Sequence, residues 1–115
     1  MKIVKSNDKQ WLSMEGYSKK IFLDSKDLGI NRARIQQIKI KPGETAKEHY
    51  HKKQTEIFCF LTSNGYWIIN GQKKEFEVGD TLVIEPFDKH EVINDSSSDY
   101  TYLAVKYNYE ENDSF

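Results

Sequence analysis

The chain has 115 residues, a size that suits one domain with a single core. Hydrophobic residues make up 37% and aromatic residues 13%, which excludes disorder, and 17 basic against 18 acidic residues leave no basic excess for nucleic acid. No apolar run could span a bilayer, the N-terminus lacks an apolar leader, and a single cysteine, Cys59, agrees with a reducing compartment. We therefore expect a cytoplasmic protein without membrane or nucleic-acid partners.

Short apolar or alternating runs, separated by turn residues, begin at residue 19. The first two predicted strands cover 19–23 and 34–40, and the polar stretch 24–31 between them has room for one helical turn. Pro42-Gly43 ends the second strand, because proline removes a backbone donor and glycine favours a turn. The next predicted strands cover 47–51, 57–61 and 66–69.

Two Asn-Gly pairs flank the run 66–69, Asn64-Gly65 before it and Asn70-Gly71 after it. Asn-Gly is a strong hairpin signal because both residues tolerate positive φ. The remaining predicted strands cover 75–78, 82–84, 90–93 and 102–107. Roughly eight or nine short strands at this spacing, without helical periodicity, predict an all-β sandwich or barrel. We expect one domain over 1–115, with a core at about 19–109 and a frayed polar tail at 110–115.

All the histidines of the chain fall into one spaced pattern with a glutamate: His49, His51, Glu56 and His90. Imidazole and carboxylate groups are ligands for divalent transition metals. His49 and His51 would share one face of a strand, a short turn would return Glu56 to them, and a folded sheet would deliver His90. The pattern predicts a site for one divalent transition metal, with positions left open for water or substrate. These ligands suit Mn, Fe, Co, Ni, Cu and Zn alike.

The two-residue period of a strand also assigns side chains to the interior. Ile38 and Ile40 share their parity with Arg34 and Gln36, which places two polar groups on an inner face where they need partners. For Arg34 the partner would be a substrate carboxylate or phosphate, or else the side chain reaches solvent at the barrel mouth.

Two aromatic residues are further candidates for the interior. Phe58 shares the parity of Glu56, and packing in the core is the favoured interpretation, with a dry wall behind the metal as the alternative. On 102–107 we expect the apolar residues Leu103 and Val105 to be buried, with an inward Tyr102 as the open alternative. The candidate substrate contacts are Arg34, Gln36, Phe58 and Tyr102.

The spacing around the first two histidines matches a known motif. Gly43 is followed by five residues, then His49-Tyr-His51, then four residues and Glu56, with Gly65 beyond. This stretch resembles the first conserved motif of the cupin superfamily.

A second stretch resembles the second cupin motif. Gly79 precedes Pro86 by six intervening residues, and His90 is followed after three residues by Asn94. The chain departs from the motif in the extra residue before Pro86, in Asp88 where glycine is usual, and in a shorter gap to His90. These departures affect turns and leave the four ligand types in order.

The resemblance implies a double-stranded β-helix, the jelly-roll barrel of cupins, with one divalent metal on His49, His51, Glu56 and His90. It also implies a homodimer and a small-molecule ligand. Two functions follow as hypotheses. The first is a metal-dependent enzyme on a small metabolite, similar to a sugar-phosphate isomerase or a dioxygenase. The second is a non-catalytic module that binds a small ligand or a metal.

Overall fold

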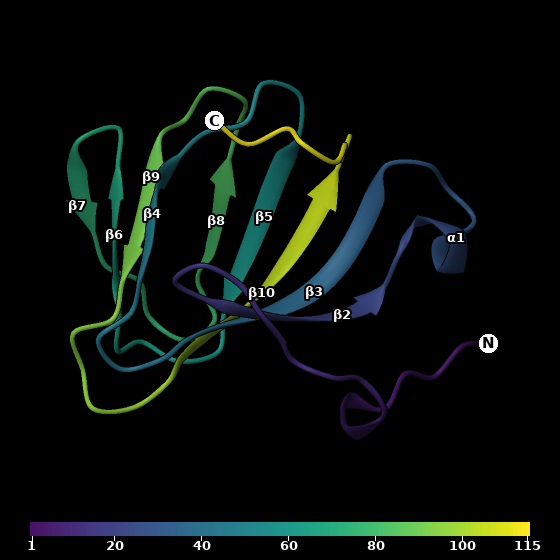
Figure 1. The fold of residues 1–115 in the computed structure, drawn as a ribbon, viewed down its shortest axis with the longest axis horizontal. Coiled ribbons are helices and arrows are strands. Elements are labelled where there is room, and N and C mark those ends of the chain that lie inside the picture. Colours follow the sequence, from purple (N-terminus) through teal and green to yellow (C-terminus); the bar gives the residue numbers. More distant parts are fainter.

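The protein was analysed as a computed structural model that describes residues 1–115. Two antiparallel sheets face each other and form a barrel-like shell (Figure 1). The larger sheet contains, in spatial order, β1 (Leu12–Ser13), β2 (Ser18–Leu23), β3 (Ala33–Ile40), β10 (Tyr100–Tyr107), β5 (Thr55–Phe60) and β8 (Thr81–Ile84). The smaller contains β4 (Thr45–His49), β9 (His90–Ile93), β6 (Tyr66–Ile69) and β7 (Gln72–Lys74). Neighbouring strands come mostly from distant parts of the chain, which is the winding of a double-stranded β-helix.

Helical structure is confined to short pieces. A 3₁₀ turn covers Ser6–Asp8, and α1 covers Ser25–Leu28 within the stretch where one helical turn was predicted. The Asp24 side chain caps α1 by accepting from the backbone N–H of Ser25 at 3.0 Å. Neither helical piece has the length or apolar character needed to cross a membrane.

The return strand of the Asn70-Gly71 hairpin lies earlier than predicted. Asn70 and Gly71 both have positive φ, 49° and 80°, and they form a two-residue turn that pairs Ile69 directly with Gln72. The strand therefore covers β7, Gln72–Lys74, and the prediction of 75–78 was wrong. Within 75–78, Phe76 packs against the core, with its ring stacked on Phe60 at a centroid distance of 4.5 Å.

The core lies between the two inner sheet faces and is rich in aromatic side chains. Trp67 from β6 is completely buried, and its Nε1 donates to the Tyr100 hydroxyl at 3.0 Å. Gly65 is required beside this pair, because a Cβ there would lie 2.3 Å from the Tyr100 ring. The main cluster comprises Ile38, Ile40, Ala46, Phe58, Phe60, Trp67, Ile84, Val92, Tyr100, Tyr102 and Ala104.

Strand β10 turns the side chain of Tyr102 toward the core, whereas Leu103 and Val105 were expected to face inward. Tyr102 pairs with Ile38 of β3 and with Phe60 of β5, and all three side chains are buried. Cross-strand partners share a sheet face, so Tyr102 points inward. Leu103 and Val105 therefore lie on the outer face and are only partly buried, which corrects the expectation that they belong to the core.

The last six residues lie against the barrel mouth instead of extending as the frayed tail that composition suggested. Tyr50 and Phe115 exchange two backbone hydrogen bonds, at 3.0 and 3.3 Å. The Asp113 carboxylate, only 7% exposed, accepts from the backbone N–H groups of Lys52, Lys53 and Gln54 at 2.8 to 3.0 Å. Three donors turned toward one carboxylate hold the tail in place.

Candidate metal centre

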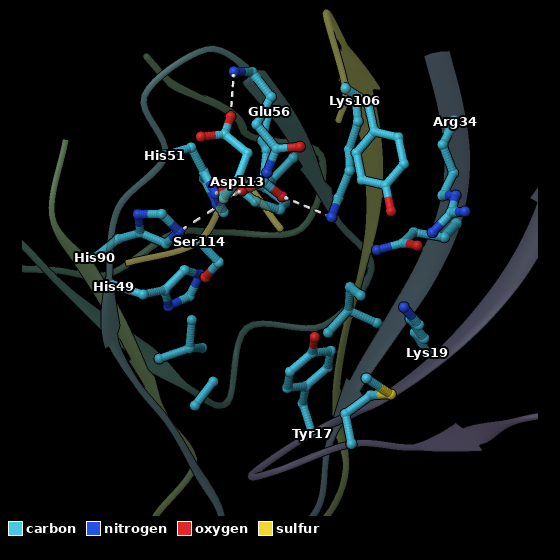
Figure 2. A pocket seen from close by; sticks show the side chains of 18 of the residues that line it. Tyr17, Lys19, Arg34, His49, His51, Glu56, His90, Lys106, Asp113 and Ser114 are labelled. Atoms are coloured by element: carbon cyan, nitrogen blue, oxygen red, sulfur yellow. Dashed lines mark hydrogen bonds and ion pairs between the residues drawn. The ribbon is translucent and has the colours of Figure 1, made fainter. Parts of the chain in front are cut away.

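The four predicted ligand residues meet at one end of the barrel interior (Figure 2). His49 ends β4, His90 begins β9 and Glu56 lies on β5, so both sheets contribute. The nearest nitrogen or oxygen atoms of the four side chains all lie within 4.8 Å of one another. Side-chain atoms this close together could bind a single cation, and the sequence pattern predicted the grouping.

His51 belongs to the cluster, but it does not lie on the strand where it was expected. The strand predicted at 47–51 is β4, which ends at His49, so the alternation of a strand does not place His51. His49 pairs with His90 across the β4–β9 ladder after a register shift. His51 lies beyond the strand end, where its Nδ1 contacts the backbone carbonyl of Asp113 in the tail. The tail therefore orients one of the four candidate ligands.

All three imidazoles are held in the same tautomer. Each Nδ1 contacts a backbone carbonyl oxygen, belonging to Lys47 for His49 at 2.7 Å, to Asp113 for His51, and to Asp88 for His90 at 2.9 Å. A carbonyl oxygen can only accept, so each Nδ1 carries the proton. In the neutral ring, Nε2 then presents a lone pair, which is how metal-binding histidines are commonly oriented.

The buried atoms at the centre fit a cation. His51 Nε2 lies 2.6 Å from Glu56 Oε1, and neither atom has any other hydrogen-bond partner. His90 Nε2 lies 3.7 Å from the same oxygen. A proton on His51 would satisfy only one of these contacts, whereas a divalent cation would engage three nitrogen lone pairs and a carboxylate. The donor set therefore fits the metal that the sequence pattern indicated.

The charge state of the ligands is also suitable for a metal. Burial lowers the pKa of His49, and burial together with the neighbouring His49 lowers the pKa of His90 to about 4. Burial opposes charge on His51, but the hydrogen bond to Glu56 outweighs it and raises the pKa of that imidazole. Burial alone would raise the pKa of Glu56, but the Lys106 ammonium and His51 hold it at about 2. Two neutral imidazoles and one carboxylate are thus ready to bind without losing protons.

A cavity of about 630 Å³ extends from the four-residue cluster across the barrel. Binding sites for small ligands commonly measure roughly 300 to 1,000 Å³. The four candidate substrate contacts, Arg34, Gln36, Phe58 and Tyr102, all line this cavity. Phe58 and Tyr102 also belong to the core cluster, so they form its apolar wall.

Arg34 has a protein partner that sequence analysis did not identify. Its guanidinium binds the Asp24 carboxylate through Nε at 3.3 Å and Nη2 at 3.1 Å, and it lies 4.5 Å from the centre of the Tyr109 ring. Asp24 is therefore both the cap of α1 and the counterion of Arg34. The Arg34 guanidinium holds the pKa of Asp24 below its usual value, which keeps this pair ionised.

Several residues that line the cavity were not identified from the sequence, among them Tyr17, Lys19 and Lys106. Lys106 shares the inward parity of Tyr102, and that alternation would have indicated its position. Tyr17 and Lys19 come from the β1–β2 hairpin, whose turn packs on β4. A Cβ at Gly16 would lie 2.1 Å from the Thr45 carbonyl oxygen, so glycine permits this packing. No local signal predicts such a contact.

The fold and the site define a class: small double-sheeted β-barrels with a three-histidine, one-glutamate cluster that could hold a metal inside the barrel. The cupin domain family matches residues 36–106, more than half of the chain, and the protein belongs to this family.

Individual relatives agree with this assignment. The Oxalate-binding protein of Thermotoga maritima is 29% identical over 82 residues, which cover 70% of this chain and 68% of that protein. The crystal structure of a predicted oxalate decarboxylase from Thermotoga maritima matches with a TM-score of 0.77 and 24% identity, covering 92% of this chain and 98% of that one. A polyketide cyclase from Streptomyces resistomycificus matches with a TM-score of 0.80 and 18% identity, covering 98% and 89%. At these identities the two structures show the shared fold alone.

Proposed function

We propose that this cupin binds one divalent transition metal through His49, His51, Glu56 and His90 and uses it to bind and activate a small metabolite. The observation that carries the proposal is the common orientation of the three imidazoles, whose Nδ1 atoms are occupied by carbonyl oxygens. Their Nε2 atoms are left for a shared ligand, beside a buried carboxylate. A bound metal would supply a Lewis acid and, for Fe or Cu, a centre for oxygen chemistry.

The cavity offers no free side-chain base near the cluster. Burial raises the pKa of Tyr102 well above its ordinary value, so this hydroxyl remains protonated and is available as a hydrogen-bond donor to a ligand. Glu48 and Glu85 are exposed and do not line the cavity. Heavy acid–base chemistry of the isomerase type therefore has little support from the residues, and metal-centred chemistry of the dioxygenase type is the stronger enzymatic proposal.

The alternative function is non-catalytic binding of a small carboxylate. Two observations favour it: the absence of a free side-chain base beside the four-residue cluster, and the similarity to a protein named for binding oxalate. Both functions require the same metal and the same cavity. They differ in whether the bound molecule is converted.

The first test is the metal content of the purified protein after loading with Mn, Fe, Co, Ni, Cu or Zn in turn. We expect one ion per chain by elemental analysis, and a sharp decrease in His49→Ala. The matched control is Glu48→Ala, which alters the exposed neighbouring residue and should retain the ion. Unchanged metal content in His49→Ala would remove this residue from the proposed site.

The second test separates the enzyme from the binding module. The metal-loaded protein is incubated with oxalate, sugar phosphates and small organic acids, with and without oxygen. Turnover of any of them supports an enzyme. Thermal stabilisation by oxalate without turnover supports the binding module, because a ligand that binds only the folded state raises its stability.

A further inference from the structure

Across the cavity from the histidines lies a group of cationic side chains. Figure 2 shows His49, His51 and His90 on one side and Arg34 and Lys19 on the other. Lys106 lies between them, with its Nζ 3.8 Å from Glu56 Oε2.

Strand register explains why these groups lie together. Lys106 of β10 is the direct cross-strand partner of Arg34 on β3 and of Glu56 on β5. Residues directly opposite in an antiparallel pair have their Cβ atoms about 5 Å apart. Lys19 comes from β2 on the far side of β3, where it pairs with Ile38. Glu56, Lys106 and Arg34 thus form a row across the larger sheet, and Lys19 lies on the same inner face beside Ile38, four residues along β3 from Arg34.

The cationic charge of this group exceeds the nearby anionic charge. Asp24 neutralises Arg34, and Glu56 is the only carboxylate within 4 Å of the Lys106 ammonium. Lys19 forms no ion pair, and burial together with the cations of Lys106 and Arg34 lowers its pKa. If Glu56 binds a divalent metal, the charges of Lys19 and Lys106 remain without a dedicated anion. Like charges brought together in a cavity are destabilising unless an anion joins them.

The acidic residues of the tail do not neutralise this group. Glu110 lines the cavity but is bound by Arg32 at 3.2 Å and by Lys53 at 3.0 Å. Glu111 also lines the cavity, and its charge partly opposes the lowering of the Lys19 pKa, but its side chain is exposed to solvent and makes no ion pair with Lys19. The excess of positive charge inside therefore persists.

Beside the cationic group lies a buried amide without a partner. Gln36 is two residues from Arg34 on β3, so the two side chains share the inner face. Gln36 is only 2% exposed and lines the cavity, and its Oε1 accepts no hydrogen bond. An unsatisfied buried acceptor destabilises the protein, and a ligand hydroxyl that donates to it would relieve that cost.

We propose that the cavity selects a small hydroxylated dianion. One oxygen group of the ligand faces the four-residue cluster of candidate metal ligands, and a hydroxyl of the ligand donates to Gln36 Oε1. A second anionic group lies among Lys19, Arg34 and Lys106. The second anionic group is a carboxylate or a phosphate, since both match these cations. This inference rests on the proposed function and names the class of metabolite that the site takes.

The test uses ligand pairs that differ at one end. Malate and 2-hydroxybutyrate share the 2-hydroxy acid group, and malate has a carboxylate where 2-hydroxybutyrate has a methyl group. The pair 3-phosphoglycerate and glycerate tests a phosphate in the same role. We expect the metal-loaded protein to bind at least one of the two dianions tenfold or more tightly than its partner, by isothermal titration calorimetry. The pair with the larger ratio identifies the anionic group.

Variants then assign the preference to residues. Lys19→Met should reduce the wild-type ratio at least threefold, while Lys39→Met, which removes a half-buried lysine outside the cavity, should leave it unchanged. Gln36→Met should reduce the preference for malate over succinate, which lacks the hydroxyl. The control Gln37→Met alters the outer face of the same strand and should not.

The outcomes distinguish this inference from the proposed function. Metal content is measured on every sample. A metal-loaded protein that binds both members of each pair equally, or a ratio that Lys19→Met leaves intact, overturns the inference while the metal site stands. Protein that takes up no metal but still prefers the dianion overturns the proposed function and supports the anion subsite.

Discussion

Replacing Asp113 by asparagine tests whether the C-terminal tail is an integral part of the barrel. The Asp113 carboxylate accepts three backbone hydrogen bonds from the 52–54 turn, and its backbone carbonyl accepts from His51 Nδ1. Asp113→Asn removes the charge and one acceptor oxygen while keeping the size of the side chain. The amide NH₂ group would then face a backbone N–H group.

The expected loss follows from the number and kind of these bonds. A hydrogen bond to a charged group contributes about 1.5 to 3 kcal/mol, and leaving a buried donor unpaired costs about 1 to 3 kcal/mol. The three bonds share one carboxylate and are not additive, and asparagine retains one acceptor. We expect the free energy of unfolding to fall by about 2 to 3 kcal/mol at pH 7. The proposed metal affinity should fall about tenfold, because the carbonyl that orients His51 is no longer fixed.

Urea denaturation of the metal-free protein measures the loss of folding stability separately from the loss of metal affinity. The matched control, Asp95→Asn, changes an exposed aspartate and should stay within about 0.5 kcal/mol of wild type. Burial works to raise the pKa of Asp113, but the backbone N–H groups of the turn outweigh it and lower this pKa. The stabilisation is therefore complete above the unfolded pKa of about 4 and is lost as the pH falls through the lower folded value.

The stability difference between wild type and Asp113→Asn should accordingly shrink below about pH 4. A variant as stable as wild type at pH 7 would show that the Asp113 carboxylate does not stabilise the fold. A difference that stays constant from pH 7 to pH 3 would refute the role of the ionised carboxylate.

Further predictions concern the core, the cation group and assembly. Gly65→Ala should destabilise the protein by about 1 to 3 kcal/mol in thermal unfolding, because the new methyl group overlaps the Tyr100 ring. An unchanged melting temperature would contradict this close packing. Lys106→Met should tighten metal binding and weaken binding of dianions, because the ammonium repels a cation at Glu56 and attracts an anion. If the affinities for metal and dianion change in the same direction, this electrostatic role of Lys106 is wrong. We also expect a homodimer. A molecular mass of one chain, measured by sedimentation velocity, would exclude it.

Local sequence patterns determined the fold class and the four-residue cluster. Short strands with turn residues between them can only bury their alternate side chains in a sandwich or barrel. Histidine and glutamate in this order gave the candidate ligands, since no other histidine exists in the chain. The positions of Arg34 and Gln36 also followed from the two-residue period and the isoleucines beside them.

Tertiary structure decided the features that depend on contacts between distant segments. The orientation of β10 was ambiguous because both of its faces carry apolar residues, and pairing with β3 and β5 selected the face with Tyr102 and Lys106. The partner of Arg34 is a helix cap, and the partner of the His51 ring is a carbonyl in the tail. Such partners have no local signature, because backbone carbonyls and isolated carboxylates occur everywhere along a chain. Only the closed barrel brings them to one place.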